Sequence, residues 1–207
     1  MILKQIRRIV FALLATGVGL YPSLYFIMDR KFGLLNTKTE TLLLSLPWNI
    51  GFYTHIVFGG LALLVGWTQF SATLRARWLP FHRWTGRVYV FAALLSATAA
   101  VCIACYATGG WVPALGFGCL GITWWYTTFQ AYRYIRQKDT ARHQVMMIYS
   151  YAACFAAVTL RLWLPLLTGI FHDFIPAYRI VAWLCWVPNL AVAHFFVVKP
   201  LRRLQPV

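Results

Sequence analysis

Apolar residues in this chain run in long, nearly uninterrupted stretches that short polar segments separate. Six of these stretches reach about 20 residues, the length that an α-helix needs to cross the hydrocarbon core of a bilayer. They lie at roughly 9–28, 50–70, 86–106, 112–132, 144–168 and 177–198. The short alternating segments of a membrane β-barrel are absent from the pattern. The sequence therefore predicts one all-α, polytopic membrane helix bundle with six transmembrane helices, a single membrane domain over residues 1–207.

The composition agrees with this pattern. Of the 207 residues, 61% are hydrophobic, ten are Trp and only four are acidic, and the mean hydropathy is +0.66. A soluble domain of this size contains far fewer large apolar side chains. We expect an integral membrane protein whose main partner is the lipid bilayer, with little chain left for a folded domain outside the membrane.

The positions of the basic residues predict the orientation. With six crossings, fourteen of the nineteen Lys and Arg residues fall on one side: Lys4, Arg7, Arg8, Arg75, Arg77, Arg83, Arg87, Arg133, Arg136, Lys138, Arg142, Lys199, Arg202 and Arg203. The positive-inside rule makes this side cytoplasmic, so we expect both termini in the cytoplasm. The net charge of +15 is spread over four short loops, which disfavours nucleic acid as a partner.

Two features of the first 50 residues refine the prediction. The apolar stretch after Arg8 is too long for a signal peptide and no small-residue cleavage site follows it, so we expect a retained helix that Pro22 kinks. The loop from Asp29 to Trp48 contains the sequence TETLLLSLP. This segment is expected to form a short amphipathic turn in the outer interface of the membrane.

Ionisable residues inside the predicted helices are candidate functional residues, because such groups are costly in hydrocarbon. At 1.5 Å of rise per residue, His55 and Arg161 lie about 7 and 10 Å below the outer surface, in the same layer. His82, His143 and His194 lie near the inner surface. A backbone carbonyl, a Tyr, water or an anionic ligand could each partner Arg161, because the predicted helices contain no acidic residue.

The segment HRWTGRVY places His82, Gly86 and Tyr89 on one helical face, with Arg83 and Arg87 beside them. The segment that begins with Arg142 and His143 repeats the combination at the start of the fifth predicted helix. Two imidazoles from different helices, flanked by arginines that can pair with propionates, suit a haem b. His82 and His143 are thus candidate haem-iron ligands, and a quinone headgroup is the lesser variant of this site.

Two alternatives to a haem site remain open: a purely structural role for these residues, and a second class of function. His and Arg near helix ends commonly extend toward lipid headgroups without binding a cofactor. The chain could also be a cofactor-free transporter whose Arg161 binds an anionic substrate, or an accessory subunit of a membrane complex. A transporter is expected to show repeats and helices broken near mid-membrane. No repeat is evident, and mid-membrane prolines are scarce. A hydrolase is disfavoured, because neither a Ser-His-Asp arrangement nor a carboxylate pair is present.

Together, His55 on a glycine-rich helix, the motif His82-Arg83-x-x-Gly86-Arg87-x-Tyr89, and the run from Arg142-His143 to Arg161 resemble a known family. It is the bacterial membrane-protein family catalogued as domain of unknown function 2306, and the resemblance spans roughly residues 50–165. It implies a bacterial inner-membrane protein and names no reaction. A helical core with histidines near both surfaces is also similar to small di-haem cytochromes b and ferric-reductase-like proteins.

These resemblances leave two hypotheses. In the first, the chain transfers electrons through an inner haem b held by His82 and His143, with an outer site at His55 and Arg161 for a quinone or a second cofactor, and it meets a redox partner protein. The cytochromes carry paired histidines toward both faces, whereas His55 has no obvious helix-borne histidine partner. In the second hypothesis, the chain is the cofactor-free transporter or accessory subunit.

Overall fold

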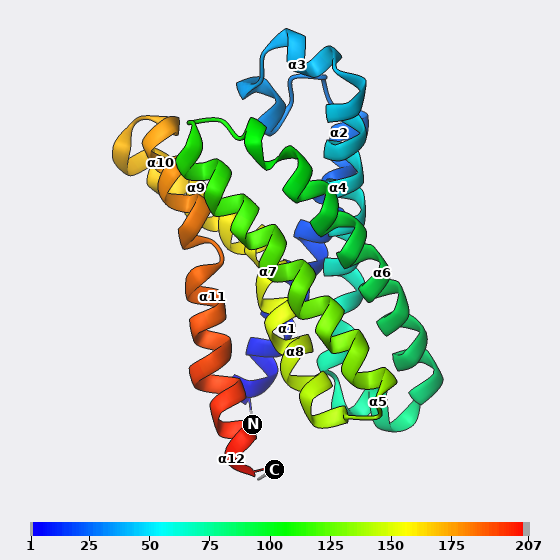
Figure 1. Cartoon of the computed structure of the whole chain (residues 1–207). Coiled ribbons are helices and arrows are strands. Elements are labelled where there is room, and N and C mark those ends of the chain that lie inside the picture. Colours follow the sequence, from blue (N-terminus) through cyan, green and yellow to red (C-terminus); the bar gives the residue numbers. More distant parts are fainter. Residues whose placement is uncertain (1, 205–207) are drawn as a thin grey trace. The chain divides into compact units, whose positions relative to one another are not determined.

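In a computed structural model that describes residues 2–204, every regular element is helical. The chain divides into two compact units, Met1–Ser96 and Ala97–Val207, and each is described by itself (Figure 1). In the described part, five helical segments are long and apolar enough to cross a bilayer: Gln5–Ile27, Leu46–Phe70, Leu79–Tyr106, Thr140–Phe171 and Phe174–Leu201. The predictions of an all-helical fold and of a membrane protein are confirmed.

The predicted segment 112–132 is not one of these five. It forms α7 (Trp111–Arg136), whose 26 residues give a length of about 39 Å. Glycine, Trp, Tyr and Thr occupy many of its positions, and these residues contribute less to hydropathy than the aliphatic residues of the other helices. Within residues 2–204, five helices are therefore long and apolar enough to span a membrane, one fewer than predicted.

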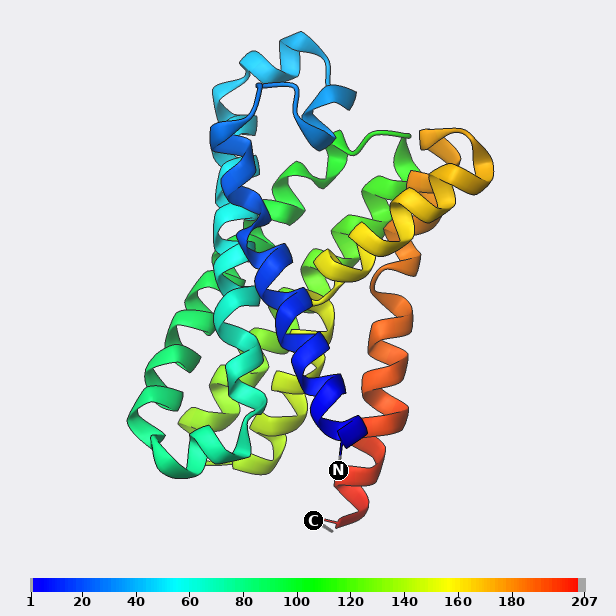
Figure 2. The same ribbon diagram turned by 180° about the vertical axis from the view of Figure 1, so that it is seen from behind.

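In the first unit, α1 (Ile2–Leu20) begins seven residues before the predicted start at residue 9. The helix tightens at Pro22 into the 3₁₀ turn η1 (Tyr21–Ser23) and continues as α2 (Leu24–Ile27). Proline lacks the N–H that an α-helix interior requires, so this change at Pro22 is the expected one. Figure 2 shows α1 running along α4 (Leu46–Gly66).

The two helices approach each other closely at two glycines. A Cβ atom on Gly60 would lie 2.5 Å from the Gly19 carbonyl oxygen and 2.9 Å from Pro22 Cγ. Only residues without a side chain allow helix backbones to come this near. The packing of α1 on α4 therefore depends on Gly60.

The loop between α2 and α4 contains η2 (Gly33–Thr37) and the short helix α3 (Glu40–Leu44). The predicted turn in this loop is thus helical, and Thr39 caps it by accepting a hydrogen bond from Leu42 N–H (3.3 Å). Glu40 forms an ion pair with Lys31 that raises the pKa of this lysine. Burial in the same loop lowers the pKa of Lys38 to about 8.

Three further elements complete the first unit: η3 (Trp67–Phe70), α5 (Ala72–Arg77) and α6 (Leu79–Ile103), which continues past Ser96 into the second unit. The third predicted helix was expected from residue 86, but α6 starts at Leu79. Pro80 lies in its first turn, where a missing N–H costs nothing. The helix therefore includes His82, which the sequence placed at its beginning.

The second unit contains the end of α6 and eight more elements: η4 (Ala104–Tyr106), α7, α8 (Thr140–Cys154), α9 (Ala156–Phe171), α10 (Phe174–Leu184), α11 (Val187–Val192), the π-helix η5 (Ala193–Val198) and α12 (Lys199–Leu204). α7 packs against α8 and α10, and α9 pairs with α10. Figure 1 shows α9 and α10 side by side, and the ribbon between α10 and α11 as a non-helical stretch. Two predicted helices, 144–168 and 177–198, are thus interrupted in the structure.

Candidate functional site

His55, the predicted outer-layer histidine, joins two helices of the first unit. Its Nδ1 donates to the Ser96 carbonyl oxygen at 3.1 Å and lies 3.0 Å from Ser96 Oγ, which in turn donates to the His55 carbonyl (2.8 Å). Ser96 is fully buried. His55 therefore has a helix-borne partner in Ser96 of α6, a residue type that the sequence prediction of paired histidines did not consider.

The other candidates of the first unit lie on α6. His82 is half-buried, Arg83 and Arg87 are exposed, and Tyr89 is fully buried. Thr85, between these residues, accepts a hydrogen bond from Gln69 (2.6 Å) and donates to the Phe81 carbonyl (2.8 Å). The helical spacing predicted for His82, Gly86 and Tyr89 is present.

His143 belongs to the second unit, on α8. Its Nδ1 lies 2.9 Å from the carbonyl oxygen of Ala131 on α7, and a carbonyl only accepts, so Nδ1 carries the hydrogen. This tautomer leaves Nε2 as the ring nitrogen with a lone pair, the arrangement usual for metal-bound histidines. The adjacent Arg142 interacts with Asp139 (3.4 Å) and lies over the ring of Tyr134 (5.7 Å).

Arg161 lies on α9, and its guanidinium turns back along the helix. Nη1 donates to the carbonyl oxygen of Ala157 (2.9 Å), and Nε is buried. Of the partners that the sequence left open, the backbone carbonyl is one that the structure contains. Because Ala157 is in the first turn of α9, this contact brings the positive charge to the level where α9 begins.

Both interrupted helices of the second unit break near their middle. Phe155, between α8 and α9, is the sixteenth of the 32 residues from Thr140 to Phe171. The second break, at Cys185 and Trp186, falls at the twelfth and thirteenth of the 28 residues from Phe174 to Leu201. Its cause is Pro188, which cannot donate to the Leu184 carbonyl and whose ring would clash with it in a continuous helix.

Two polar side chains connect the breaks, and with the carbonyls they contact they form what we term the helix-break cluster: Thr159, Asn189 and the carbonyls of Ala152 and Cys185. Asn189 Nδ2 donates to Thr159 Oγ1 (3.1 Å) and to the Ala152 carbonyl (3.3 Å), and Thr159 Oγ1 donates to the Cys185 carbonyl. Helix ends leave carbonyls without intrahelical donors, and the cluster supplies donors to two of them. Cys154 and Cys185, both buried, stand at the two breaks.

A fully buried polar contact links α7 to α8. Thr128 and Ser150, both with 0% exposure, have their hydroxyl oxygens 2.7 Å apart. Thr128 donates to the Trp124 carbonyl (2.7 Å), so Ser150 is the donor in the pair. The sequence analysis did not identify either residue, because buried Ser and Thr are common in membrane helices.

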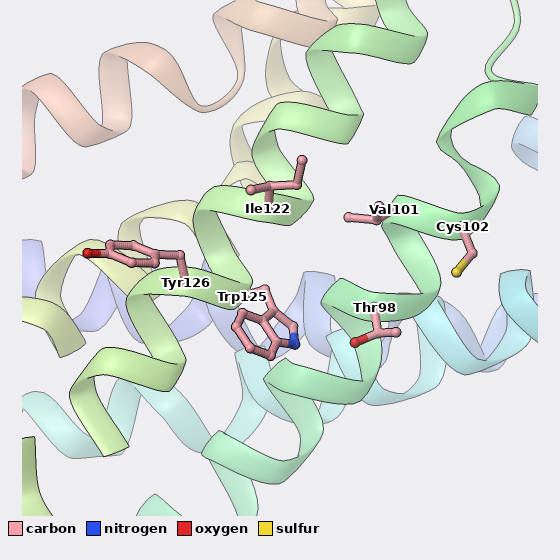
Figure 3. Close-up of a pocket in the computed structure, with 6 residues that line it drawn as sticks. All are labelled: Thr98, Val101, Cys102, Ile122, Trp125 and Tyr126. Carbon is pink, nitrogen blue, oxygen red and sulfur yellow. The ribbon is translucent and has the colours of Figure 1, made fainter. Parts of the chain in front are cut away.

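An open pocket of about 420 Å³ lies within the second unit (Figure 3). It is lined by Thr98, Val101 and Cys102 of α6 and by Ile122, Trp125 and Tyr126 of α7. None of the predicted haem or quinone residues lines this pocket. Between residues 2 and 204, no group of three or more His, Cys, Asp or Glu side chains is placed to hold a metal ion.

A family model described as "Predicted membrane protein (DUF2306)" matches residues 52–197. The chain belongs to this family. No curated protein and no solved structure matches the chain.

The match to DUF2306 extends beyond the range that the sequence motifs indicated. It runs from α4 to η5 and includes both breaks, Thr159, Asn189 and every candidate residue described above. All of α1 lies outside it, as does α12. The helix-break cluster is therefore in the part of the chain that defines membership of the family.

Proposed function

We propose that this DUF2306 protein carries a small anion across the membrane at the helix-break cluster. The observation that supports this most directly is the pair of membrane-spanning segments that are both interrupted near mid-span and joined by Thr159 and Asn189. Discontinuous helices of this kind form the substrate sites of many secondary transporters, where unwound backbone and helix ends meet the solute. This proposal is the cofactor-free transporter among the two hypotheses from the sequence.

The charges of the second unit favour an anion over a cation. The four acidic residues, Asp29, Glu40, Asp139 and Asp173, all lie outside the five membrane-spanning segments. Arg161 adds a positive charge at the level where α9 begins, and the N-terminus of this 16-residue helix is the positive end of its dipole. A cation at this level would meet no carboxylate.

The donors of the cluster supply the rest of the site. Thr159 Oγ1 donates at present to the Cys185 carbonyl, and Asn189 Nδ2 donates to the Ala152 carbonyl and to Thr159 Oγ1. An anion that enters the cluster is a better acceptor than a carbonyl, because hydrogen bonds to charged groups are the stronger ones. Binding would therefore draw these donors away from Ala152 and Cys185 and loosen the contact between the two breaks, which is how we propose that the segments change position.

The test is anion flux in proteoliposomes, with chloride, nitrate and formate as probes. Exchanging Arg161 for glutamine is expected to lower the flux of the transported anion by about tenfold or more, the effect of losing roughly 1.4 kcal/mol of attraction. The matched control is Arg133→Gln, which removes an exposed arginine of α7 and should leave flux unchanged. If the folded wild-type protein gives no flux above empty liposomes for any of the three anions, the proposal fails.

We further propose that α7 is a sixth crossing and that both termini face the cytoplasm of a bacterial inner membrane. Its length of about 39 Å suffices for a bilayer core of about 30 Å. The one-sided distribution of cations then agrees with the positive-inside rule. Reporter fusions after Gly110 and after Lys138 measure this: opposite locations of the two reporters are expected, and a shared location would show that α7 does not cross.

A second candidate function rests on the orientation of His143. Its Nδ1–H bond to Ala131 presents the imidazole as a metal ligand would be presented, so this residue fits a haem b. In this proposal His82 of the first unit is the second ligand, and the haem would supply one-electron transfer. The quinone variant places the headgroup at His55 and Arg161.

A reduced-minus-oxidised spectrum of purified protein from haem-supplied cells separates the two candidates. The haem proposal expects stoichiometric b-type bands that disappear in His82→Ala and in His143→Ala. The control is His172→Ala, a change in an exposed residue at the end of α9. Full bands in both ligand variants, or a colourless wild-type preparation, would contradict it.

A further inference from the structure

The inner half of the second unit contains a polar contact that neither candidate function uses. The hydroxyl oxygen of Tyr149, on α8, and Nδ1 of His194, at the start of η5, are 2.7 Å apart. The two rings are nearly parallel, with an interplanar angle of 15° and centroids 6.3 Å apart. Both side chains are half-buried, and Phe195 covers the imidazole edge-on at 5.0 Å.

The backbone at His194 is itself unusual. Residues 193–198 form a π-helix, and Lys199 N–H donates to the His194 carbonyl, five residues before it. π-Helical turns are rare, and they occur frequently at functional sites. Here the wide turn begins one residue before His194 and brings its ring onto Tyr149. A side-chain contact and a backbone irregularity therefore coincide at one residue.

We propose that Tyr149 and His194 form a proton-binding site that couples anion movement to protons. This inference rests on the proposed anion transport, and it assigns the co-transported species. Histidine is the side chain that ordinarily changes charge between pH 5 and 8, and a tyrosine hydroxyl can both donate to it and accept from it. The pair thus accommodates both protonation states of the imidazole.

The proton balance at this site is simple. In the neutral ring one nitrogen carries hydrogen, and the hydrogen bond with Tyr149 can run in either direction. When the ring takes a proton from water, both nitrogens carry hydrogen, so Nδ1 donates to Tyr149 Oη and the hydroxyl turns its own hydrogen away. Release of the proton to water restores the neutral pair. No other reactant is consumed, and the site gains one positive charge while the proton is bound.

The distance to the helix-break cluster suits such a coupling. His194 follows Asn189 by five residues, a rise of about 7 Å along the helix axis, and Tyr149 precedes Ala152 by three, so the Tyr149–His194 pair lies within about two helical turns of the cluster. A positive charge on His194 would therefore attract an anion at Asn189 and Thr159. Binding of a proton and an anion together keeps the net charge of the site unchanged.

The charged groups around the pair are few. η5 packs against α8, α11 and α12. On α8, Tyr149 contacts the ring, and Arg142 lies two turns away in its ion pair with Asp139. α11 has no titratable side chain, and α12 starts with Lys199, with Arg202 and Arg203 after it in the sequence. Asp139 is paired with Arg142, and the other charged neighbours are cations, so the imidazolium gains its stabilisation from Tyr149 and from the anion.

The experiment has two readouts in liposome-reconstituted protein. The first is an NMR titration of ¹⁵N-histidine-labelled full-length chain between pH 4.5 and 8.5, in which the His194 signals are those missing from His194→Gln. We expect these signals to titrate in the wild type, and their midpoint to shift in Tyr149→Phe. An imidazole that keeps one protonation state over the whole range would overturn the proposal, whether or not any anion is transported.

The second readout is the pH dependence of flux for the anion that the wild type transports. We expect flux to rise at least about fivefold from pH 8 to pH 5.5, and the rise to be lost in His194→Gln. Tyr149→Phe removes only one oxygen atom, so it is the second variant to test if His194→Gln does not fold. The pH profile of its flux should shift in the same direction as the midpoint of the NMR titration. An equal pH dependence in wild type and Tyr149→Phe would contradict the coupling. His172→Gln, on an exposed residue, is the control for general effects of removing a histidine.

Discussion

Replacing Gly60 with valine is expected to lower the free energy of unfolding by about 3 kcal/mol, at the upper end of the range for overpacked sites. A Cβ atom at this position would lie 2.5 Å from the Gly19 carbonyl oxygen, and a backbone carbonyl cannot turn aside as a flexible side chain can. α1 would have to separate from α4. Thermal or denaturant unfolding of the purified protein, followed by circular dichroism, measures the loss.

The matched control for this change is Gly17→Ala on α1. A Cβ atom at Gly17 meets nothing within 4 Å, and alanine favours the helix more than glycine does, by up to about 1 kcal/mol. Stability should therefore hold or rise. If Gly60→Val unfolds at the same point as the wild type, the close approach of α1 and α4 is not what holds the first unit together.

The second large effect is expected at the helix-break cluster. Replacing Asn189 with leucine removes the donor to the Ala152 carbonyl and to Thr159, and replacing Thr159 with valine removes the donor to the Cys185 carbonyl. Each change alone should cost about 1 kcal/mol or more, because a half-buried polar group loses its partner. Because the residues belong to one network, the double variant should cost less than the sum.

Unfolding free energies of the two single variants and the double variant measure this coupling as a double-mutant cycle. Thr127→Val is the control, since the Thr127 hydroxyl bonds carbonyls of its own helix, at Thr123 and Trp124, and its loss should cost under about 1 kcal/mol. Additive effects of the Asn189 and Thr159 changes would show that the breaks are not energetically joined. The same variants are also expected to slow anion flux.

The sequence predicted the helices well and their interruptions poorly. Runs of apolar residues reveal which segments are helical, because only a helix satisfies its backbone within one segment in lipid. The interruptions were missed because hydropathy does not depend on whether a residue's backbone hydrogen bond is made. The neighbouring residues Pro188 and Asn189 could have predicted the break after α10. A proline leaves a backbone carbonyl of its helix without an N–H donor, and within a membrane a polar side chain has to satisfy that carbonyl. No breaker residue stands at Phe155.

The candidate residues show the same division. Histidine and arginine stand out in an apolar chain, so His55, His143 and Arg161 were found from the sequence alone. Their contacts with Ser96, Ala131 and Ala157 could not be predicted, because a sequence does not show which small residue or backbone carbonyl will lie next to a given side chain. Whether a histidine binds a cofactor depends on these contacts. The sequence therefore identified candidate chemical groups but not the contacts that they make.

Cys154 and Cys185 place a native thiol at each helix break, where a chemical probe can react. One thiol ends α8 and the other follows α10, and both are buried, whereas Cys102 and Cys105 are exposed. A membrane-permeant maleimide should therefore react most slowly at Cys154 and Cys185, the slow class, since Cys102, Cys105 and the half-buried Cys119 are more accessible. The rate of the slow class during turnover would report how often the breaks open, with every native residue in place.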